Sequence, residues 1–340
     1  MSFQFAKSEI EDRAASTRTD SPARSLSIVW DDGPAASAKA WGALYDKVPY
    51  AAYQQHYAYG EVIAGLGGGV HRAVVRRGDA PIALIQLQNR RFFGCATLAT
   101  IMRGPVWVPE EIDDALKVDV YRLIKQTAPI KGLKALLLMP ETAEATAEAD
   151  AGLIRAVSAY HTVLVDLERE EDALRRAMDG KWRNRLRAAE KAALDIVKLG
   201  RKPADYSWLL QEEAEQQGRA GYHALPPAFT TLFQEAAGAS TVFALEAKQG
   251  AERLGGVLFL RHGRGATYHI GWASETGKRL NVHNLLMWRA MLALKQKGVA
   301  TLDLGGLDTN QRPGIARFKL GLGGRLFSQA GAFCLSPSRL

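Results

Sequence analysis

The most informative part of the sequence is a pair of short stretches near its end: Asp303–Gly306 (DLGG) and Gly314–Lys319 (GIARFK). They follow an apolar run that reads as a strand, and they bring a glycine turn and one lysine close together. Glycine lets the backbone approach a ligand, because it has no side chain and tolerates positive φ. A lysine held at such a turn can stabilise a developing oxyanion or bind a phosphate. The two stretches therefore predict a ligand-binding turn that contains Lys319.

Upstream of these stretches, one order of elements occurs twice, which predicts two similar units. Each unit reads as two helices, three strands in a meander, a helix and a further strand. The strands are predicted at Val70–Arg76, Ile82–Gln88, Cys95–Ile101 and Ala135–Met139 in the first unit, and at Val242–Ala247, Gly255–Arg261, Ala266–Trp272 and Ala300–Leu304 in the second. This order is compatible with the acyltransferase fold of the GNAT type. We predict an α/β fold with two tandem GNAT-like domains, each built on a mixed sheet.

The length of 340 residues also suits two domains. Residues 1–24 mix acidic residues with arginine and serine, and they read as a disordered leader. The first domain is predicted over residues 25–168 and closes with a strand at His161–Leu167. The second domain, over residues 169–340, begins with a long helix at Asp172–Ala193 and ends with a strand at Phe327–Phe333.

The composition indicates the kind of partner that the protein binds but does not identify one partner. The net charge of +8 favours polyanionic partners such as tRNA, nucleotide phosphates or anionic lipid headgroups. No apolar run approaches the roughly 18 residues needed to span a bilayer, and the N-terminus has no signal-peptide core. Seven histidines and two cysteines form no metal-ligand pattern, and two cysteines argue against a disulfide scaffold. We predict a cytoplasmic protein without a metal site.

The most basic segment of the chain is Lys181–Lys191 (KWRNRLRAAEK). On a helix, Trp182 and Leu186 lie on one apolar face, whereas Arg183 and Arg187 lie four residues apart on an adjacent face. Like charges at this spacing repel each other, and an anionic ligand would offset the repulsion. The segment therefore predicts a site for a diphosphate or an RNA backbone. A solvated helix face is the alternative interpretation.

These motifs together resemble the FemABX family, the tRNA-dependent aminoacyltransferases that build peptidoglycan interpeptide bridges. The basic helix resembles the family's K-x-R-x-x-I/L-x-x-A-x-K signature. Further motifs match in order and spacing at Gly271–Ser274, Leu285–Met291, Asp303–Gly306 and Gly314–Lys319. The resemblance covers roughly residues 27–334 and is strongest after Asp166. It implies two GNAT-like domains in the compact, FemX-like form that lacks a helical-hairpin insertion.

The resemblance also implies roles for residues of the second domain. Lys319 and Phe318 match the family's catalytic pair: the lysine contacts the transferred aminoacyl group or the tRNA end, and the aromatic ring stacks on the terminal adenine. Arg183 and Lys181 match basic residues implied in binding the diphosphate of the acceptor. Arg187 continues the same basic face as a substrate-binding candidate.

Other candidate residues lie in the first domain and in the glycine turn. Gln55–Tyr59 (QHYAY) stands where the family often has Gln-Ser-x-x-Trp, so Gln55 and Tyr59 are substrate-binding candidates. Histidine and tyrosine replace serine and tryptophan here, which implies a different pocket. Asp303 is expected to cap the glycine turn and orient its loop. Gly306 is expected to let the substrate approach that loop.

The reaction implied is attack by a free amine on the ester of an aminoacyl-tRNA, which needs no cofactor. The acceptor would be UDP-MurNAc-pentapeptide or lipid II, the latter with peripheral contact to the membrane, and the enzyme is expected to be a monomer. Two alternatives stay open at this point. One is an acyl-CoA-dependent N-acyltransferase that acts on a polysaccharide, lipid or metabolite amine. The other is a non-catalytic protein that binds RNA or nucleotides through the basic helix.

Overall fold

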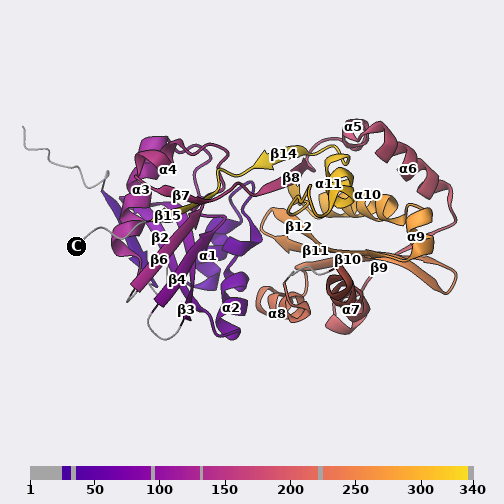
Figure 1. Ribbon diagram of the computed structural model, residues 1–340, viewed down its shortest axis with the longest axis horizontal. Coiled ribbons are helices and arrows are strands. Elements are labelled where there is room, and N and C mark those ends of the chain that lie inside the picture. Colours follow the sequence, from indigo (N-terminus) through magenta and orange to yellow (C-terminus); the bar gives the residue numbers. More distant parts are fainter. Residues whose placement is uncertain (1–24, 32–35, 93–95, 131–132, 221–224, 336–340) are drawn as a thin grey trace, which may run out of the picture.

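The computed structural model describes residues 25–31, 36–92, 96–130, 133–220 and 225–335. The predicted leader, residues 1–24, and Cys95 lie outside these ranges. Figure 1 shows two sheets side by side, each with helices packed against it. The sheets mix parallel and antiparallel pairs, as predicted. The repeated order of elements therefore gives two α/β layers of the same kind.

The first sheet contains eight of the described strands, in the order β1-β2-β3-β4-β6-β15-β7, with β5 paired to β3. Its strands are β1 (Leu26–Trp30), β2 (Gly69–Arg77), β3 (Ala80–Phe92), β4 (Ala96–Met102), β5 (Val106–Trp107), β6 (Leu133–Met139), β7 (Ile154–Val157) and β15 (Ala332–Leu335). Its helices are α1 (Ala38–Tyr45), the 3₁₀ turn η2 (Tyr53–Gln55), α2 (Tyr57–Gly65), α3 (Asp114–Thr127) and α4 (Thr146–Asp150). The side chain of Asp113 caps α3, whose buried stripe of Val118, Tyr121 and Ile124 packs on the sheet.

The second sheet contains seven of the described strands, in the order β14-β8-β13-β12-β11-β10-β9. Its strands are β8 (His161–Asp166), β9 (Asp195–Lys198), β10 (Val242–Gln249), β11 (Glu252–His262), β12 (Gly265–Ala273), β13 (Thr301–Asp303) and β14 (Arg325–Ser328). Its helices are α5 (Glu171–Ala177), α6 (Gly180–Lys191), α7 (Pro203–Ala220), α8 (Pro227–Ala237), α9 (Glu275–Arg279), α10 (Val282–Lys295) and α11 (Pro313–Leu320). Helices α6 and α10 share a core with one face, and α7 and α8 share a core with the other (Figure 1).

Two strands cross the division predicted at residues 168 and 169. Strand β8 precedes the division but pairs with β13 and β14 in the second sheet. Strand β15, at the end of the chain, pairs with β6 and β7 in the first. The two units are thus interlocked through the sheets themselves, although the division along the chain remains a prediction.

The predicted strand Phe327–Phe333 is therefore wrong as a single element. It is divided into β14 and β15, which belong to different sheets. The chain turns between them at Gly331, which has a φ of 126°. A Cβ atom at this position would lie 2.6 Å from the carbonyl oxygen of Val157, so a glycine is needed where the chain changes sheets.

The predicted helix Asp172–Ala193 is also two elements, α5 and α6. Met178 has extended backbone at the end of α5, and Asp179 then caps α6 by accepting hydrogen bonds from the backbone N–H groups of Lys181 and Trp182. A side-chain cap of this kind satisfies donors that would otherwise have no partner at a helix start. The helical periodicity of the sequence continues across this break, which is why the pattern alone suggested one helix.

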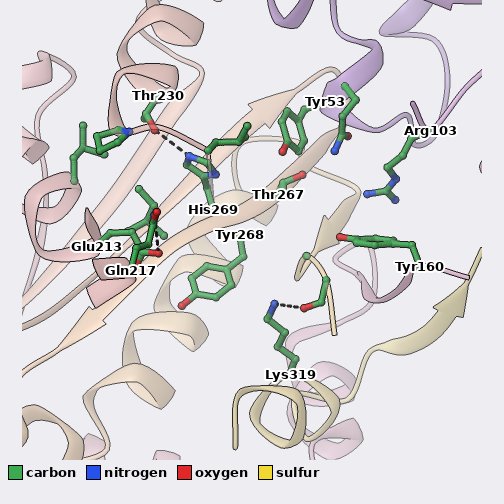
Figure 2. A pocket seen from close by; sticks show the side chains of 17 residues that line it. Tyr53, Arg103, Tyr160, Glu213, Gln217, Thr230, Thr267, Tyr268, His269 and Lys319 are labelled. Atoms are coloured by element: carbon green, nitrogen blue, oxygen red, sulfur yellow. Dashed lines mark hydrogen bonds between the residues drawn. The ribbon is translucent and has the colours of Figure 1, made fainter. Parts of the chain in front are cut away.

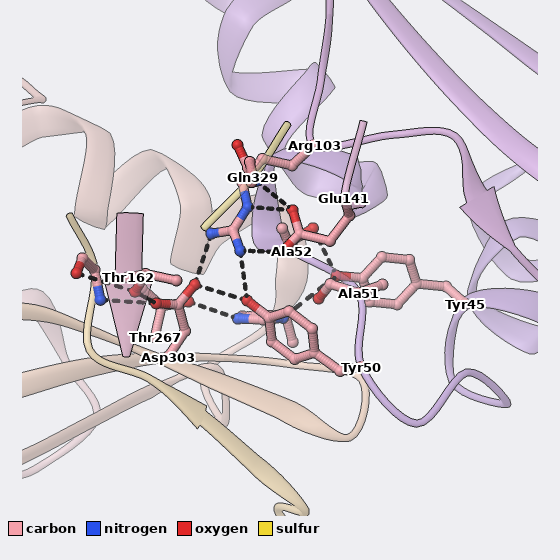
Figure 3. Close-up of polar contacts among 12 residues, drawn as sticks. Tyr45, Tyr50, Ala51, Ala52, Arg103, Glu141, Thr162, Thr267, Asp303 and Gln329 are labelled. Atoms are coloured by element: carbon pink, nitrogen blue, oxygen red, sulfur yellow. Dashed lines mark hydrogen bonds and ion pairs between the residues drawn. The ribbon is translucent and has the colours of Figure 1, made fainter. Parts of the chain in front are cut away.

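A network of buried charges and hydrogen bonds joins the two halves (Figure 3). The Asp303 carboxylate, fully buried at the end of β13, accepts hydrogen bonds from Arg103 (2.6 Å), Tyr50 (2.7 Å) and Thr162 (2.5 Å). Arg103 also donates through Nε to Glu141 at 2.7 Å. Burial alone would raise the pKa of Asp303, but the Arg103 charge and these hydrogen bonds outweigh burial and hold that pKa below its usual value.

We expect Arg103→Leu to lower the free energy of unfolding by about 3–5 kcal/mol, because Asp303 would stay buried without its cation. Urea unfolding followed by circular dichroism measures the change. The matched control is Arg122→Leu, because Arg122 forms an exposed ion pair with Asp119, and its loss should cost less than about 1 kcal/mol. Equal effects of the two substitutions would contradict the role assigned to the buried pair.

Candidate functional site

A cleft opens in the second sheet where β12 and β13 separate. These parallel strands pair at three positions only, from Gly265 opposite Thr301 to Thr267 opposite Asp303. Beyond Thr267, β12 continues to Ala273 while the chain leaves β13 through the glycine turn. The corresponding strands of the first sheet, β4 and β6, stay paired at seven positions. The described strands thus leave a parallel edge open in the second half alone.

A β-bulge shapes the open edge of β12. The register against β11 shifts so that Phe259 is opposite Tyr268 and Leu258 is opposite Ile270, which leaves His269 as an extra residue. Bulges re-aim side chains next to functional sites. His269 contacts the Thr230 hydroxyl through Nε2 at 2.9 Å, and burial lowers its pKa to about 4, so the imidazole is neutral near pH 7.

The first cavity of the cleft, about 240 Å³, lies between the two halves of the chain (Figure 2). The second half contributes Thr267–Ile270 of β12, Gly305 and Gly306 of the glycine turn, Lys319 of α11, and residues of α7 and α8 that include Glu213. The first half contributes Tyr53, Gln54, Arg103 and Tyr160. Gln54 has a buried side-chain oxygen without a hydrogen-bond partner among the described residues. A ligand with an N–H group would satisfy that oxygen.

Lys319 is a cation in the wall of the first cavity. Its side chain is nearly buried, and Nζ donates a hydrogen bond to the carbonyl oxygen of Gly306 at 2.8 Å. Burial lowers the pKa of Lys319 to about 8, although the Asp303 carboxylate raises it, and the Arg312 charge lowers it further. The ammonium form therefore dominates below about pH 8.

Asp303 fixes the glycine turn that Lys319 contacts. Its Oδ1 atom accepts a hydrogen bond from the backbone N–H of Gly305 at 2.7 Å, and the Thr162 hydroxyl lies 3.0 Å from the carbonyl oxygen of Gly305. Gly305 has a φ of 73°, a conformation that glycine adopts without strain. Asp303 thus orients the loop from behind, and Gly306 forms part of the cavity wall.

A second cavity, about 420 Å³ and largely apolar, lies on the other side of Tyr268. Phe318 and Ile315 of α11 line it, together with His283 of α10 and two cations, Lys278 and Arg312. Phe318 packs 5.7 Å from the ring of Trp182, and its carbonyl oxygen accepts a hydrogen bond from the indole of Trp182. The two adjacent residues Phe318 and Lys319 therefore face different cavities.

The basic helix does not bring its predicted residues to these cavities. Arg183 donates to the backbone carbonyls of Arg176 (2.9 Å) and Met178 (2.5 Å), which caps the end of α5. Lys181 and Arg187 are exposed on α6 and line neither cavity. Their assignment to a substrate diphosphate stays a prediction.

Gln55 and Tyr59 lie behind the first cavity, where they support its wall. The Gln55 side chain donates to the carbonyl oxygens of Gln86 (3.1 Å) and Met102 (2.8 Å). Tyr59 packs against Tyr53 and a ring of α8 in a buried aromatic cluster. Their neighbours Tyr53 and Gln54 reach the cavity instead.

Sequence reasoning missed most of the residues that line the two cavities, among them Arg103, Tyr160, Tyr268 and Gln54. Strand alternation around Gly265–Ala273 was the available signal for Tyr268, which is a large polar side chain in the middle of β12. Arg103 gave no local signal, because its partner Asp303 is 200 residues away along the chain. Among the described residues, no group of histidine, cysteine or acidic side chains could hold a metal ion. No described helix has the length and apolarity to cross a bilayer.

Residues 180–320 match a family model described as an acetyltransferase (GNAT) domain. No curated protein matches the chain. Among solved structures, FemX aligns with a TM-score of 0.74 at 15% identity, over 88% of this chain and 96% of FemX. The chain thus has a FemX-like fold.

Two further structures align over the whole of their own lengths. One is a tandem GNAT protein from the clavulanic acid biosynthesis pathway, with a TM-score of 0.52 at 14% identity over 93% of this chain. The other is a conserved protein of unknown function from Bacteroides thetaiotaomicron, with a TM-score of 0.57 at 13% identity over 91% of this chain. The predicted tandem GNAT architecture is confirmed, and the GNAT match supports an acyltransferase.

We expect the Lys319 ammonium to titrate near pH 8, and Arg312→Ala to move this titration to higher pH, because the substitution removes a neighbouring positive charge. NMR of protein labelled with ¹³C and ¹⁵N at lysine follows the titration, with Lys319→Met to assign the resonance. Arg122→Ala, which removes an exposed cation from α3, is the control and should leave the titration unchanged. A midpoint that Arg312→Ala lowers would contradict the effect assigned to the Arg312 charge.

Proposed function

We propose that this protein is an aminoacyltransferase that moves an amino acid from aminoacyl-tRNA to an amine of a peptidoglycan precursor, either UDP-MurNAc-pentapeptide or lipid II. The observation that carries the proposal is the position of Lys319, a nearly buried cation at the opened edge of β12. Its neighbour Phe318 lines a second cavity, so two ligands can meet at this point. The FemX-like fold supports the donor and acceptor classes that the FemABX resemblance implies.

The reaction requires no covalent intermediate with the protein. The amine attacks the ester carbonyl, and negative charge develops on the carbonyl oxygen. Below about pH 8, the Lys319 ammonium is available to stabilise that charge, and its near-complete burial strengthens the interaction. Its hydrogen bond to the Gly306 carbonyl fixes the direction of Nζ before the substrate arrives. Alignment of two bound substrates contributes the remainder of the rate enhancement.

The second cavity suits the end of the RNA donor. Its apolar wall offers the ring of Phe318 for stacking against a base. Lys278 and Arg312 supply positive charge for backbone phosphates. Helix α6 lies alongside, because Trp182 contacts Phe318. The exposed cations of α6, Lys181 and Arg187, are therefore on the side of the donor, which favours the RNA backbone over the diphosphate of the acceptor as their partner.

The first cavity suits the acceptor amine and the peptide that carries it. Both halves of the chain line it, so an acceptor there would touch both domains. The buried Gln54 oxygen can accept a hydrogen bond from a peptide N–H. The Glu213 carboxylate, which accepts from the Gln217 side chain at 3.4 Å, adds a hydrogen-bond acceptor for an N–H of the amine. In this proposal the enzyme is a cytoplasmic monomer that touches the membrane only when lipid II is the acceptor.

One observation favours a second candidate, an acyl-CoA-dependent N-acyltransferase. The parting of β12 and β13 gives a cleft that a thin pantetheine arm could enter, and the matching family model is described as an acetyltransferase domain. A non-catalytic RNA-binding protein has less support, because it leaves the buried Lys319 without a role.

The deciding experiment offers both donors in parallel. Radiolabelled amino acid on a mixed aminoacyl-tRNA pool and radiolabelled acetyl-CoA are each incubated with UDP-MurNAc-pentapeptide. RNase-sensitive labelling of the peptide supports the aminoacyltransferase. Labelling from acetyl-CoA alone supports the second candidate. RNA binding without transfer from either donor would support the binding protein.

We expect Lys319→Ala to lower kcat by about 10²–10³, the typical effect of removing one group that stabilises an oxyanion. The circular dichroism spectrum should stay that of the wild type. Arg122→Ala serves as the matched loss of an exposed cation and should leave kcat unchanged. Retention of more than half of the wild-type rate by Lys319→Ala would rule out its catalytic role.

We expect Lys278→Ala to raise KM for the RNA donor about tenfold and to leave KM for the acceptor unchanged. A tenfold change corresponds to roughly 1.4 kcal/mol, close to the value of one hydrogen bond to a charged group. The salt dependence of donor binding should become shallower as well, because one phosphate contact is lost. An effect on the acceptor alone would reverse the assignment of the two cavities.

A further inference from the structure

We propose that Tyr268, supported by His283, is the acid that protonates the leaving oxygen of the donor. This inference rests on the proposed function, because it assigns a step to the same site. The observation behind it is that Tyr268 stands between the two cavities and that its hydroxyl lies 3.3 Å from Nε2 of His283. Nothing in the sequence motifs singled out either residue.

Tyr268 occupies the position that a leaving group must pass. It is the one described residue that lines both the first cavity and the second. The carbonyl group of the donor would lie by Lys319 in the first cavity, and the RNA that carries it would lie by Phe318 in the second. The ester bond between carbonyl carbon and RNA oxygen would then pass beside Tyr268. An acid that serves this bond must be within hydrogen-bond reach of the leaving oxygen. The Tyr268 side chain is in the wall at that point.

The local packing holds the hydroxyl beside the imidazole. Gly271, the second residue after the bulge at His269, leaves the space that the pair occupies. A Cβ atom at Gly271 would lie 1.8 Å from the Tyr268 hydroxyl and 2.6 Å from Nε2 of His283. The Tyr268 ring packs against Phe259 at 5.5 Å, which limits its rotation. The pair therefore depends on a glycine at position 271.

His283 is suited to a supporting role. Burial, with a smaller effect of the Lys278 charge, lowers its pKa to about 4, so the imidazole is neutral near pH 7. A neutral imidazole carries a proton on one of its two nitrogens. In the proposed state that proton is on Nε2, which donates to the phenol oxygen. The phenol proton can then pass to the substrate, and the same hydrogen bond stabilises the phenolate that forms.

The step balances without any other reactant. The amine nitrogen forms a bond to the carbonyl carbon, and the bond from that carbon to the carrier oxygen breaks. The phenol proton of Tyr268 passes to the carrier oxygen, which leaves as a hydroxyl group. The phenolate then takes one proton from the ammonium nitrogen of the new bond, so Tyr268 ends the cycle protonated. Lys319 stays charged throughout and contacts the oxyanion.

The test compares two ester substrates whose leaving groups differ in their need for a proton. The probes are an alanyl ester of adenosine, whose alkoxide must be protonated, and alanyl p-nitrophenyl ester, whose phenolate leaves without help. Tyr268→Phe should lower the rate with the adenosyl ester by about 10²–10⁴, the usual contribution of a general acid. The rate with the nitrophenyl ester should stay within about threefold of wild type, because no proton is needed. Equal losses with both esters, or no loss with either, would overturn the proposal.

Two further variants separate the acid from a structural role. Gly271→Ala should displace the hydroxyl and give the same selective loss as Tyr268→Phe, whereas Tyr57→Phe, outside both cavities, should change neither rate. His283→Ala should give a smaller loss of the same selectivity. A loss with His283→Ala that is equal for the two esters would overturn the supporting role of His283.

The outcome is distinguishable from failure of the proposed function. Transfer from acetyl-CoA but not from aminoacyl-tRNA would remove the RNA donor, while the two small esters would still test Tyr268. A readout without turnover is the ¹³Cζ resonance of Tyr268 in protein labelled at tyrosine, assigned with Tyr268→Phe. It should shift in His283→Ala, while the resonance of Tyr206, which bonds to Gln234, should not. An unshifted Tyr268 resonance would overturn the pair.

Discussion

The buried ion pair between Arg103 and Asp303 connects the two halves of the chain. A carboxylate cannot stay charged in an apolar interior without a partner and hydrogen bonds. Asp303 is at the end of β13, and Arg103 comes from the other half of the chain. Separation of the two halves would therefore expose the Asp303 carboxylate or leave it buried without its cation. The same carboxylate holds the N–H of Gly305. One group therefore joins the contact between the halves to the glycine turn at the cleft.

A second constraint is the separation of two parallel strands in one half only. The halves share the same order of elements, yet β4 and β6 stay paired where β12 and β13 part. Paired strands satisfy their own backbone groups and leave no room for a ligand between them. In the first half the two strands stay paired, and the cleft opens in the second half. The first half contributes to the wall of that cleft through three side chains, Tyr53, Arg103 and Tyr160.

Two neighbouring residues, Phe318 and Lys319, line different cavities of the cleft. Lys319 and Phe318 follow each other on α11, so their side chains diverge, one toward the cavity shared by both halves and one toward the apolar cavity. Partial burial keeps the lysine pKa near 8, where the Asp303 and Arg312 charges act in opposite directions. Tyr268 stands between the cavities, backed by an imidazole that burial keeps neutral. A cation, an aromatic surface and a phenol thus meet at the cleft.

The repeated α/β order, the tandem GNAT-like fold and the glycine turn beside Lys319 were predictable from the sequence, because they depend on periodicity and on local turn chemistry. The sequence misread the helix that breaks at Asp179 and the strand that divides at Gly331, since a side-chain cap and a change of sheet leave the hydrophobic pattern intact. Three features became apparent only from the three-dimensional arrangement: Arg103 pairs with Asp303, Gln55 and Tyr59 lie behind the cavity wall, and Tyr268 contacts His283. These contacts join residues that are far apart in the chain, or they depend on where two strands separate. The spacing of residue types along the sequence predicts neither property.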